Sequence, residues 1–323
     1  MKALRLGTRR SQLATAQSRG VADEVTRLTG QPVELVEITT YGDVSRESLV
    51  SIGGTGVFVS ALRDALLAGE IDFAVHSLKD LPTAQPPELA LAALPPRADP
   101  RDALVARDGL GFEELVMAGG AAGPARIGTG SPRRMAQLNA WARGLGREID
   151  TVSIRGNVDT RIGYVRAGEL DAVVLAAAGL GRLGRTGEIT DLLAPDAVLP
   201  APGQGALAVE CTAARPELVA QLARLDDPHT RIAVTAERTL LAALEAGCSA
   251  PVGAFADLLA DGQTVTELRL RGVVGTPDGA QLVQLSTTGP LPASVEEAAA
   301  VGRQLADEML AKGAAGLMGE RAL

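Results

Sequence analysis

Apolar and polar positions along the first hundred residues predict short strands separated by amphipathic helices. An apolar run bounded by turn residues is typical of a buried strand, and apolar residues three or four positions apart indicate a helix. The pattern predicts strands at 4–6, 33–39, 71–75 and 89–94, and helices at 12–28 and 58–68. Strands that alternate with helices favour a mainly parallel sheet, because parallel strands need a crossover between them.

A second series of the same kind begins near Ala103, after Pro95, Pro96 and Pro100, which are typical of a crossing between domains. It has predicted strands at 126–128, 149–154 and 172–175, and helices at 132–143 and 158–167. A second crossing is expected at 200–205, where prolines and glycines gather again.

The pattern changes once more at Pro216, where two helices precede three strands and a last helix. The predicted helices are 217–225, 228–245 and 295–312, and the predicted strands are 252–258, 267–274 and 281–287. Strands and helices that are segregated in this way indicate a small α+β domain.

Composition and charge exclude several classes of function. The net charge of −8 and the 2% of aromatic residues argue against a nucleic-acid partner. The apolar run at 173–178 is too short to span a membrane, and the first ten residues lack the apolar region of a signal peptide, so we expect a cytoplasmic protein with no membrane partner. Two histidines without a nearby cysteine predict no metal site.

The stretch IDFAVHSLKDLP, at 71–82, places Lys79 and Asp80 directly after a predicted buried strand. Ligands bind beyond the carboxyl ends of strands in open α/β sheets. Lys79 is also the one interior lysine, since the other two are Lys2 and Lys312. An ionised Asp80 among cations suits the stabilisation of a positive charge that develops on a substrate. The alternative is a solvated ion pair on a surface loop.

Arginines follow several of the predicted strands, on the same face as Lys79. These arginines are Arg9, Arg10, Arg133, Arg134, Arg155, Arg161 and Arg182. Cations in the first turn of a helix are unfavourable for that helix, so Arg133 and Arg134 favour a binding role. The turn at 129–131 adds backbone N–H groups at a helix start. The pattern predicts a site for a multiply charged anion, with isolated surface ion pairs as the alternative.

The two cysteines differ in their surroundings. Cys248 lies in EAGCSAPVG, a predicted tight loop after a helix, whereas Cys211 follows the apolar run 206–209. A loop thiolate can act as a nucleophile or carry a covalent group, and a buried thiol is expected to be inert. A structural disulfide is not expected in a reducing compartment. An ordinary loop cysteine without function is the alternative for Cys248.

Eight motifs resemble the porphobilinogen deaminase family, also called hydroxymethylbilane synthases, and they occur in the family's order through about residue 255. They are LRLGTRRSQLA, VHSLKDLP, DPRDALV, GTGSPRRMAQL, IRGNVDTR, LDAVVLAAAGLGRLG, LPAPGQGALAVE and TAERTLLAALEAGCSAPVG. The last 65 residues resemble the family only in general character.

The resemblance implies a transferase of tetrapyrrole biosynthesis. Four porphobilinogen molecules are joined with loss of ammonia onto a dipyrromethane cofactor, and hydroxymethylbilane is released by hydrolysis. It also implies two periplasmic-binding-protein-like (type II) α/β domains joined by two crossings, plus a small C-terminal α+β domain. In this sequence the domains would be 1–97 with 198–215, 98–197, and 216–323. A monomer is expected from the family.

The resemblance also assigns site residues. Cys248 would carry the dipyrromethane through a thioether, and Asp80 would be catalytic, stabilising the azafulvene formed when ammonia leaves. The implied cofactor-binding residues are Lys79, Thr129, Ser131, Arg133 and Arg134. The implied residues for the carboxylates of porphobilinogen and the polypyrrole intermediates are Arg9, Ser11, Arg155, Arg161, Arg182 and Gln204. The stretches 71–82 and 129–161 would then form two walls of a cleft.

The sequence departs from the family pattern in one loop and one turn. Thr55 and Ser60 stand where the family commonly has lysines, and Gly130 stands where it often has serine. We hypothesise that the loop before Gly56 acts mainly as a lid, since its positive charge is lost.

Two other classes remain as alternatives. A solute-binding protein or a regulator can share the two-domain fold, but it would need an export signal or a DNA-binding segment. A nucleotide- or phosphate-using enzyme could use the turn GTGSPRR, but no Walker-type stretch occurs.

Overall fold

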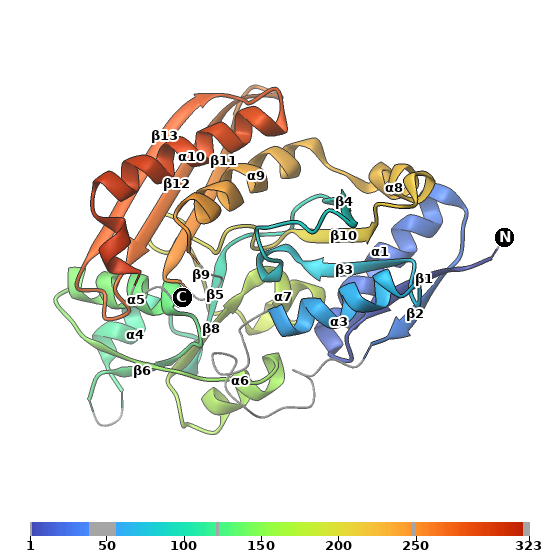
Figure 1. Cartoon of the computed structure of the whole chain (residues 1–323). Helices are drawn as coiled ribbons and strands as arrows, with labels where there is room; N and C mark the ends of the chain where they lie inside the picture. Colours follow the sequence, from blue (N-terminus) through green and yellow to red (C-terminus); the bar gives the residue numbers. More distant parts are fainter. Residues whose placement is uncertain (1, 39–55, 121–122, 247–249, 319–323) are drawn as a thin grey trace. The chain divides into compact units, whose positions relative to one another are not determined.

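The computed structural model describes residues 2–38, 56–120, 123–246 and 250–318 (Figure 1). The chain divides into two compact units. Unit 1 comprises Met1–Ala98 with Gly205–Arg231, and unit 2 comprises Asp99–Gln204 with Ile232–Leu323.

Unit 1 contains a five-stranded sheet in the order β2-β1-β3-β10-β4. Its strands are β1 (Leu4–Thr8), β2 (Val33–Glu37), β3 (Phe73–Ser77), β4 (Leu89–Ala93) and β10 (Leu207–Thr212). β1 is parallel to β2 and β3, whereas β10 is antiparallel to both of its neighbours, β3 and β4. The chain thus returns after residue 204 to complete the first sheet.

Helices cover both faces of this sheet, because side chains on neighbouring strand residues point to opposite faces. Phe73 and Val75 pack with α1 (Gln12–Thr29) and α8 (Pro216–Leu222). Ala74 lies between them in sequence and packs with α3 (Gly56–Leu67). A short 3₁₀ helix, η1 (Leu78–Asp80), continues β3, and another, η4 (Ala223–Leu225), follows α8.

Unit 2 contains a second five-stranded sheet of the same design, in the order β7-β6-β8-β5-β9. Its strands are β5 (Asp102–Ala106), β6 (Ala125–Gly128), β7 (Ile149–Val152), β8 (Ala172–Ala176) and β9 (Asp191–Leu193). β6 is parallel to β7 and β8, and β5 is antiparallel to β8 and β9.

The second sheet is also covered on both faces. One face packs against α4 (Phe112–Ala118) and α5 (Pro132–Gly144), and the other against α6 (Val158–Arg166) and α7 (Ala177–Arg182). The 3₁₀ helices η2 (Arg107–Gly109) and η3 (Thr186–Glu188) lie in the connections. Each parallel strand therefore directs its carboxyl end to one edge of a two-sided sheet.

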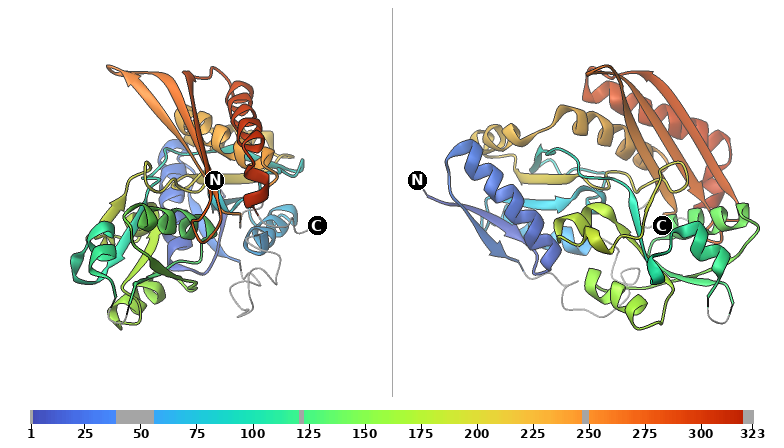
Figure 2. Two further views of the ribbon diagram at one scale, coloured as in Figure 1. Left: turned by 90° about the vertical axis from the view of Figure 1, so that its left-hand side faces the viewer. Right: turned by 180° about the vertical axis from the view of Figure 1, so that it is seen from behind.

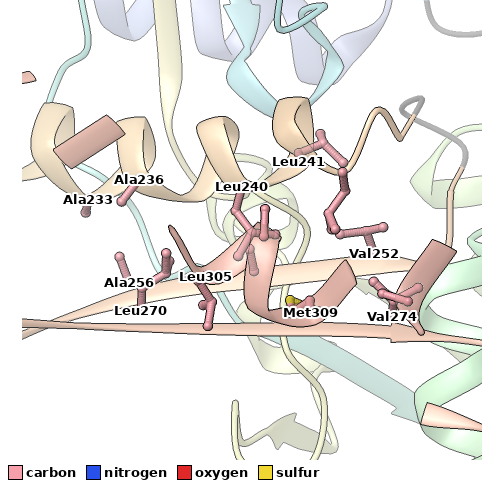
Figure 3. Packing of buried hydrophobic residues seen from close by; sticks show 14 of the residues in the cluster. Ala233, Ala236, Leu240, Leu241, Val252, Ala256, Leu270, Val274, Leu305 and Met309 are labelled. Carbon is pink, nitrogen blue, oxygen red and sulfur yellow. The ribbon is translucent and has the colours of Figure 1, made fainter. Parts of the chain in front are cut away.

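The C-terminal part of unit 2 is a three-stranded antiparallel sheet, β11 (Val252–Asp261), β12 (Thr264–Gly275) and β13 (Leu282–Pro290). Side chains of α9 (Pro228–Ala243) and α10 (Val295–Ala311) form one apolar core with this sheet, as Figure 3 shows for Leu240, Leu270 and Leu305. α10 runs along the sheet (Figure 2) and is followed by the 3₁₀ helix η5 (Ala314–Leu317).

The structure confirms the α/β fold class with a C-terminal α+β part. Most predicted elements are present within a few residues, but β9, α4 and the antiparallel course of β5 and β10 were not predicted from the sequence. α8, which the sequence assigned to the third domain, contributes Leu218 and Leu222 to the core of unit 1. The exact boundaries of the three domains stay a prediction.

Candidate functional site

The carboxyl end of β1 leads into a tight turn that carries Arg9 and Ser11. Gly7 makes the turn's close packing possible, because a Cβ there would lie 2.3 Å from Cδ1 of Ile71. Ser11 caps α1, and its hydroxyl accepts a hydrogen bond from the N–H of Ala14 at 3.2 Å. Arg9 is half-buried beside this cap.

The carboxyl end of β3 presents Lys79 and Asp80 on a 3₁₀ turn that is anchored at both ends. Leu78 and Leu81 are buried, and the N–H of Leu81 donates to the carbonyl of Leu78. The N–H of Leu78 in turn donates to the carbonyl of Ala206, next to β10. Lys79 and Asp80, between the two leucines, are half-buried. The two leucines thus hold Lys79 and Asp80 at the end of β3. Arg9 and Ser11 follow the end of the neighbouring parallel strand, β1. We call these four residues the unit 1 edge.

A buried carboxylate lies inside the sheet of unit 1. Glu210 of β10 is fully buried and receives hydrogen bonds from Arg63 of α3, at 2.8 and 3.0 Å, and from Gln85. His76 Nε2 lies 3.4 Å from its Oε2. Burial alone would raise the pKa of Glu210, but His76 and Arg63 together lower it to about 2. Glu210 is therefore an ionised group that joins α3 to the sheet.

The carboxyl end of β6 in unit 2 repeats the turn that follows β1. A Cβ at Gly128 would lie 2.6 Å from Leu170, and Thr129 is fully buried. Ser131 caps α5, accepting from the N–H of Arg134 at 3.4 Å. Packing explains why position 130 is a glycine, because a Cβ there would lie 2.8 Å from the carbonyl oxygen of Ile154.

Arg133 and Arg134 turn inward from the start of α5 and share one carboxylate. Arg133 Nη1 lies 2.8 Å from Oδ2 of Asp102, and Arg134 donates from Nε and Nη2 to Oδ1. Gln204 donates to the same Oδ1 at 2.8 Å. Burial would raise the pKa of Asp102, but the two guanidinium groups hold it well below its usual range. Arg133, Arg134 and Gln204, which were predicted to bind ligands, thus meet around Asp102, which was not predicted as a site residue.

Three further arginines lie beyond β7 and β8. Arg155 is exposed after β7, and Arg161 lies in α6 with its Nε donating to the carbonyl of Gly156. Burial lowers the pKa of Arg161, and repulsion from Arg134 lowers it further. Burial also lowers the pKa of Arg182, at the end of α7. We call this set the unit 2 edge: Thr129, Ser131, Arg133, Arg134, Arg155, Arg161 and Arg182.

Several predicted residues are not described. Cys248 and the loop with Thr55 lie outside the described residues, whereas Ser60 is exposed on α3. Cys211 is fully buried in the core of unit 1, and burial raises its thiol pKa to about 11, as expected for an inert cysteine. Among the described residues, no group of His, Cys, Asp and Glu could hold a metal ion. In the same ranges no helix is long and apolar enough to cross a membrane.

Two family models match the chain over most of its length. "Porphobilinogen deaminase, dipyromethane cofactor binding domain" matches residues 4–220, and "Porphobilinogen deaminase, C-terminal domain" matches residues 231–311. The chain belongs to the porphobilinogen deaminase family. The family resemblance of the eight motifs is thereby confirmed.

Curated relatives carry the same name. "Porphobilinogen deaminase 1" of Streptomyces avermitilis is 75% identical over 320 residues, covering 99% of this chain and 98% of the relative. The porphobilinogen deaminase of Thermobifida fusca is 57% identical over 314 residues, covering 96% and 94%. Porphobilinogen deaminases are transferases of tetrapyrrole biosynthesis that polymerise porphobilinogen.

The comparison with solved structures finds weak likeness to solute-binding proteins. A periplasmic substrate-binding protein of an ABC transporter from Coxiella burnetii is 11% identical with a TM-score of 0.42, covering 70% of this chain and 93% of the other.

The unit 2 edge fits the anionic dipyrromethane cofactor of the porphobilinogen deaminase family. Arg133 Nε is buried without an acceptor among the described residues. The pKa of Arg161 is lowered by burial and by repulsion from Arg134. A buried guanidinium group that keeps an N–H without an acceptor, or carries uncompensated charge, binds carboxylates well, because its planar fork matches both oxygens.

Proposed function

We propose that this member of the porphobilinogen deaminase family uses Asp80 as its catalytic carboxylate and Cys248 as the attachment point of dipyrromethane. The observation that carries the proposal is the turn Leu78–Leu81, whose buried leucines hold Asp80 at the carboxyl end of β3. A carboxylate held in place before the reaction can stabilise positive charge as it develops, without reorganisation at the moment of reaction.

Asp80 would accept hydrogen bonds from pyrrole N–H groups and stabilise the cation that forms when ammonia leaves porphobilinogen. Lys79 would bind a carboxylate of the cofactor, and Arg9 and Ser11 would bind carboxylates of the substrate. Lys79 and Asp80 are half-buried, which reduces screening by water and strengthens both interactions.

The unit 2 edge would hold the anionic groups. Thr129, Ser131, Arg133 and Arg134 would act on the cofactor, which when bound supplies the pyrrole carbon to which substrate units are added. Arg155, Arg161 and Arg182 would bind the acetate and propionate groups of the substrate and polypyrrole intermediates. Gln204, predicted as a substrate ligand, is buried and donates to Pro100 and Asp102, so we propose that it supports this site through Asp102.

Intact-mass spectrometry of the purified protein tests this function. The proposal predicts a mass above that of the sequence by two linked pyrrole units, together with turnover of porphobilinogen. Cys248→Ser should abolish the extra mass, and Cys211→Ala, at the buried cysteine, should keep it. A bare sequence mass without turnover would contradict the proposal.

We further propose that the protein is a cytoplasmic monomer that binds neither nucleic acid nor membranes, as composition and family predict. Light scattering coupled to size-exclusion chromatography tests the monomer, and cell fractionation tests the location. A dimer mass, or enrichment in the membrane fraction, would contradict the corresponding part.

A further inference from the structure

The motif DPRDALV contains a buried carboxylate to which no role of its own has been assigned. Asp102 is the first residue of β5 and is fully buried. Because β5 runs antiparallel to β8, Asp102 pairs with Ala176, the last residue of β8. Its side chain therefore lies at the sheet edge where the parallel strands end, close to the start of α5.

Asp102 accepts hydrogen bonds from two residues at this edge and forms an ion pair with a third. Its Oδ1 accepts from Arg134 Nη2 at 2.7 Å, from Arg134 Nε at 3.1 Å and from Gln204 Nε2 at 2.8 Å, and its Oδ2 lies 2.8 Å from Arg133 Nη1. The side chains of Arg133, Arg134 and Gln204 all belong to residues that are at least 95% buried. A carboxylate with this many charge-assisted contacts determines the position of each donor.

Backbone carbonyls complete the orientation of the two guanidinium groups. Arg134 Nη1 donates to the carbonyl of Val174 at 2.9 Å, and Arg133 Nη1 donates to the carbonyl of Leu199 at 2.5 Å. Each arginine thus contacts both Asp102 and a backbone carbonyl. The N–H at Nε of Arg133 is buried and has no acceptor among the described residues.

The cluster leaves an excess of positive charge. Two guanidinium groups face one carboxylate, and Arg134 also acts on Arg161 by repulsion. An excess buried cation favours an anionic ligand, whereas two uncompensated ones would disfavour the folded state. Asp102 leaves the edge positively charged while removing most of the repulsion between Arg133 and Arg134.

We infer that Asp102 is a positioning residue, which orients Arg133 and Arg134 for the carboxylates of the dipyrromethane cofactor. This inference rests on the proposed function, because it assumes that these two arginines bind the cofactor. It assigns to Asp102 an effect on cofactor loading and substrate binding in addition to its effect on stability.

Asp102→Asn is the decisive substitution, because it keeps the shape of the side chain and removes its charge. We expect the fraction of protein that carries the added cofactor mass to fall. The KM for porphobilinogen of the loaded fraction should rise by about tenfold, because Arg134 loses its fixed position and acts by repulsion on Arg161, the proposed substrate ligand. Asp102→Glu should load better than Asp102→Asn, because the charge is kept, but should remain below the wild type, because the carboxylate is displaced by one methylene.

Glu210→Gln is the matched control, since Glu210 is also a fully buried carboxylate with an arginine partner, but inside the sheet of unit 1. Both variants should melt at lower temperature than the wild type. Glu210→Gln should nevertheless carry the full cofactor mass and show an unchanged KM, when measured well below its melting temperature.

Intact mass, KM and melting temperature of these variants decide the inference. Full loading and a wild-type KM in Asp102→Asn, despite a lower melting temperature, would assign Asp102 a structural role alone and overturn it. If Asp102→Asn does not fold, Asp102→Glu decides in the same way: full loading with unchanged KM overturns the inference and reduced loading supports it. A wild-type protein without added mass would contradict the proposed function instead.

Discussion

The unit 1 edge and the unit 2 edge are built on the same plan. Both belong to five-stranded sheets with equivalent strand orders and one antiparallel strand beside the parallel ones. Both begin with a Gly-Thr pair at the end of a strand, Gly7-Thr8 and Gly128-Thr129, followed by a serine that caps a helix. The difference between them lies in the position of the fully buried carboxylate that each five-stranded sheet contains.

The fully buried carboxylate on the strands of the first five-stranded sheet is inside the sheet, and that of the second is at the edge. Glu210 pairs with Ala74, within β3, and it is neutralised by Arg63 of α3. Asp102 pairs with Ala176, at the end of β8, and it holds two arginines of the unit 2 edge. The unit 1 edge keeps a half-buried carboxylate, Asp80, next to Lys79.

This difference separates two tasks. A half-buried carboxylate on an anchored turn suits stabilisation of a developing cation, so unit 1 would supply the chemistry. Cations gathered around one buried carboxylate suit the binding of several anionic groups, so unit 2 would supply most of the binding, with Lys79, Arg9 and Ser11 of unit 1 adding to it. Variants that alter one edge at a time test this division.

Asp80→Asn should have the largest effect. Loss of the anchored charge at the unit 1 edge is expected to lower kcat by about 10²–10³-fold, the usual cost of removing one preorganised group that stabilises charge. Steady-state turnover of porphobilinogen measures it. The control is Asp307→Asn, at an exposed carboxylate of α10, which should leave kcat unchanged. Near-normal turnover in Asp80→Asn would remove the catalytic role from unit 1.

Glu210→Gln should lower stability without changing kinetics. The pKa of Glu210 is about 2 in the folded protein, against an ordinary value of 4.5. Linkage then gives a stabilisation of about 3 kcal/mol that is present above pH 4.5 and is lost as the pH falls toward 2. Urea unfolding of both proteins at pH 7 and near pH 3 measures the difference, which should shrink in acid. A difference that does not depend on pH would contradict the assigned ionisation.

Arg161→Gln should raise the KM for porphobilinogen by about tenfold, because a charge-assisted contact to a substrate carboxylate is lost. The matched control is Arg166→Gln on the same helix, since Arg166 is exposed and pairs with Glu188. Steady-state kinetics of both variants measures the contrast. Equal KM values in the two would show that the unit 2 edge does not use Arg161 for substrate.

Ser11→Ala and Ser131→Ala should have the smallest effects, because each removes one helix cap at equivalent places of the two edges. Each should cost about 1 kcal/mol of stability. Ser131→Ala should in addition reduce cofactor loading, since its cap bond is made by the N–H of Arg134. Thermal unfolding and intact mass test the pair, and equal loading would show that capping is the whole role of Ser131.

Local patterns in the sequence predicted the parallel strands, the main helices and the residues that follow the strands. Period-two and helical periodicities, caps and prolines are local signals, so elements such as α1, α5 and β3 could be placed. The pairing of β10 with β3 was not predictable in this way, because the two strands are joined only through the long segment that forms the second sheet.

Local patterns in the sequence also could not predict the role of the buried groups at the site, Asp102, Arg133 and Arg134. Arg133 and Arg134 look like exposed ligand-binding cations in the sequence, since they open a helix. The structure shows them buried against Asp102, which lies 32 positions before Arg134 in the sequence. The motif DPRDALV contained this signal, but an isolated aspartate at the start of an apolar strand does not reveal its partners.

Intact-mass spectrometry of Asp80→Asn before and after mixing with porphobilinogen tests the division between the two edges most directly. If unit 2 holds the cofactor and unit 1 supplies the catalytic carboxylate, the purified variant should already carry the mass of the cofactor. That mass should not increase after mixing on the time scale of wild-type turnover. A variant without cofactor, or one whose mass increases as fast as that of the wild type, would contradict the division.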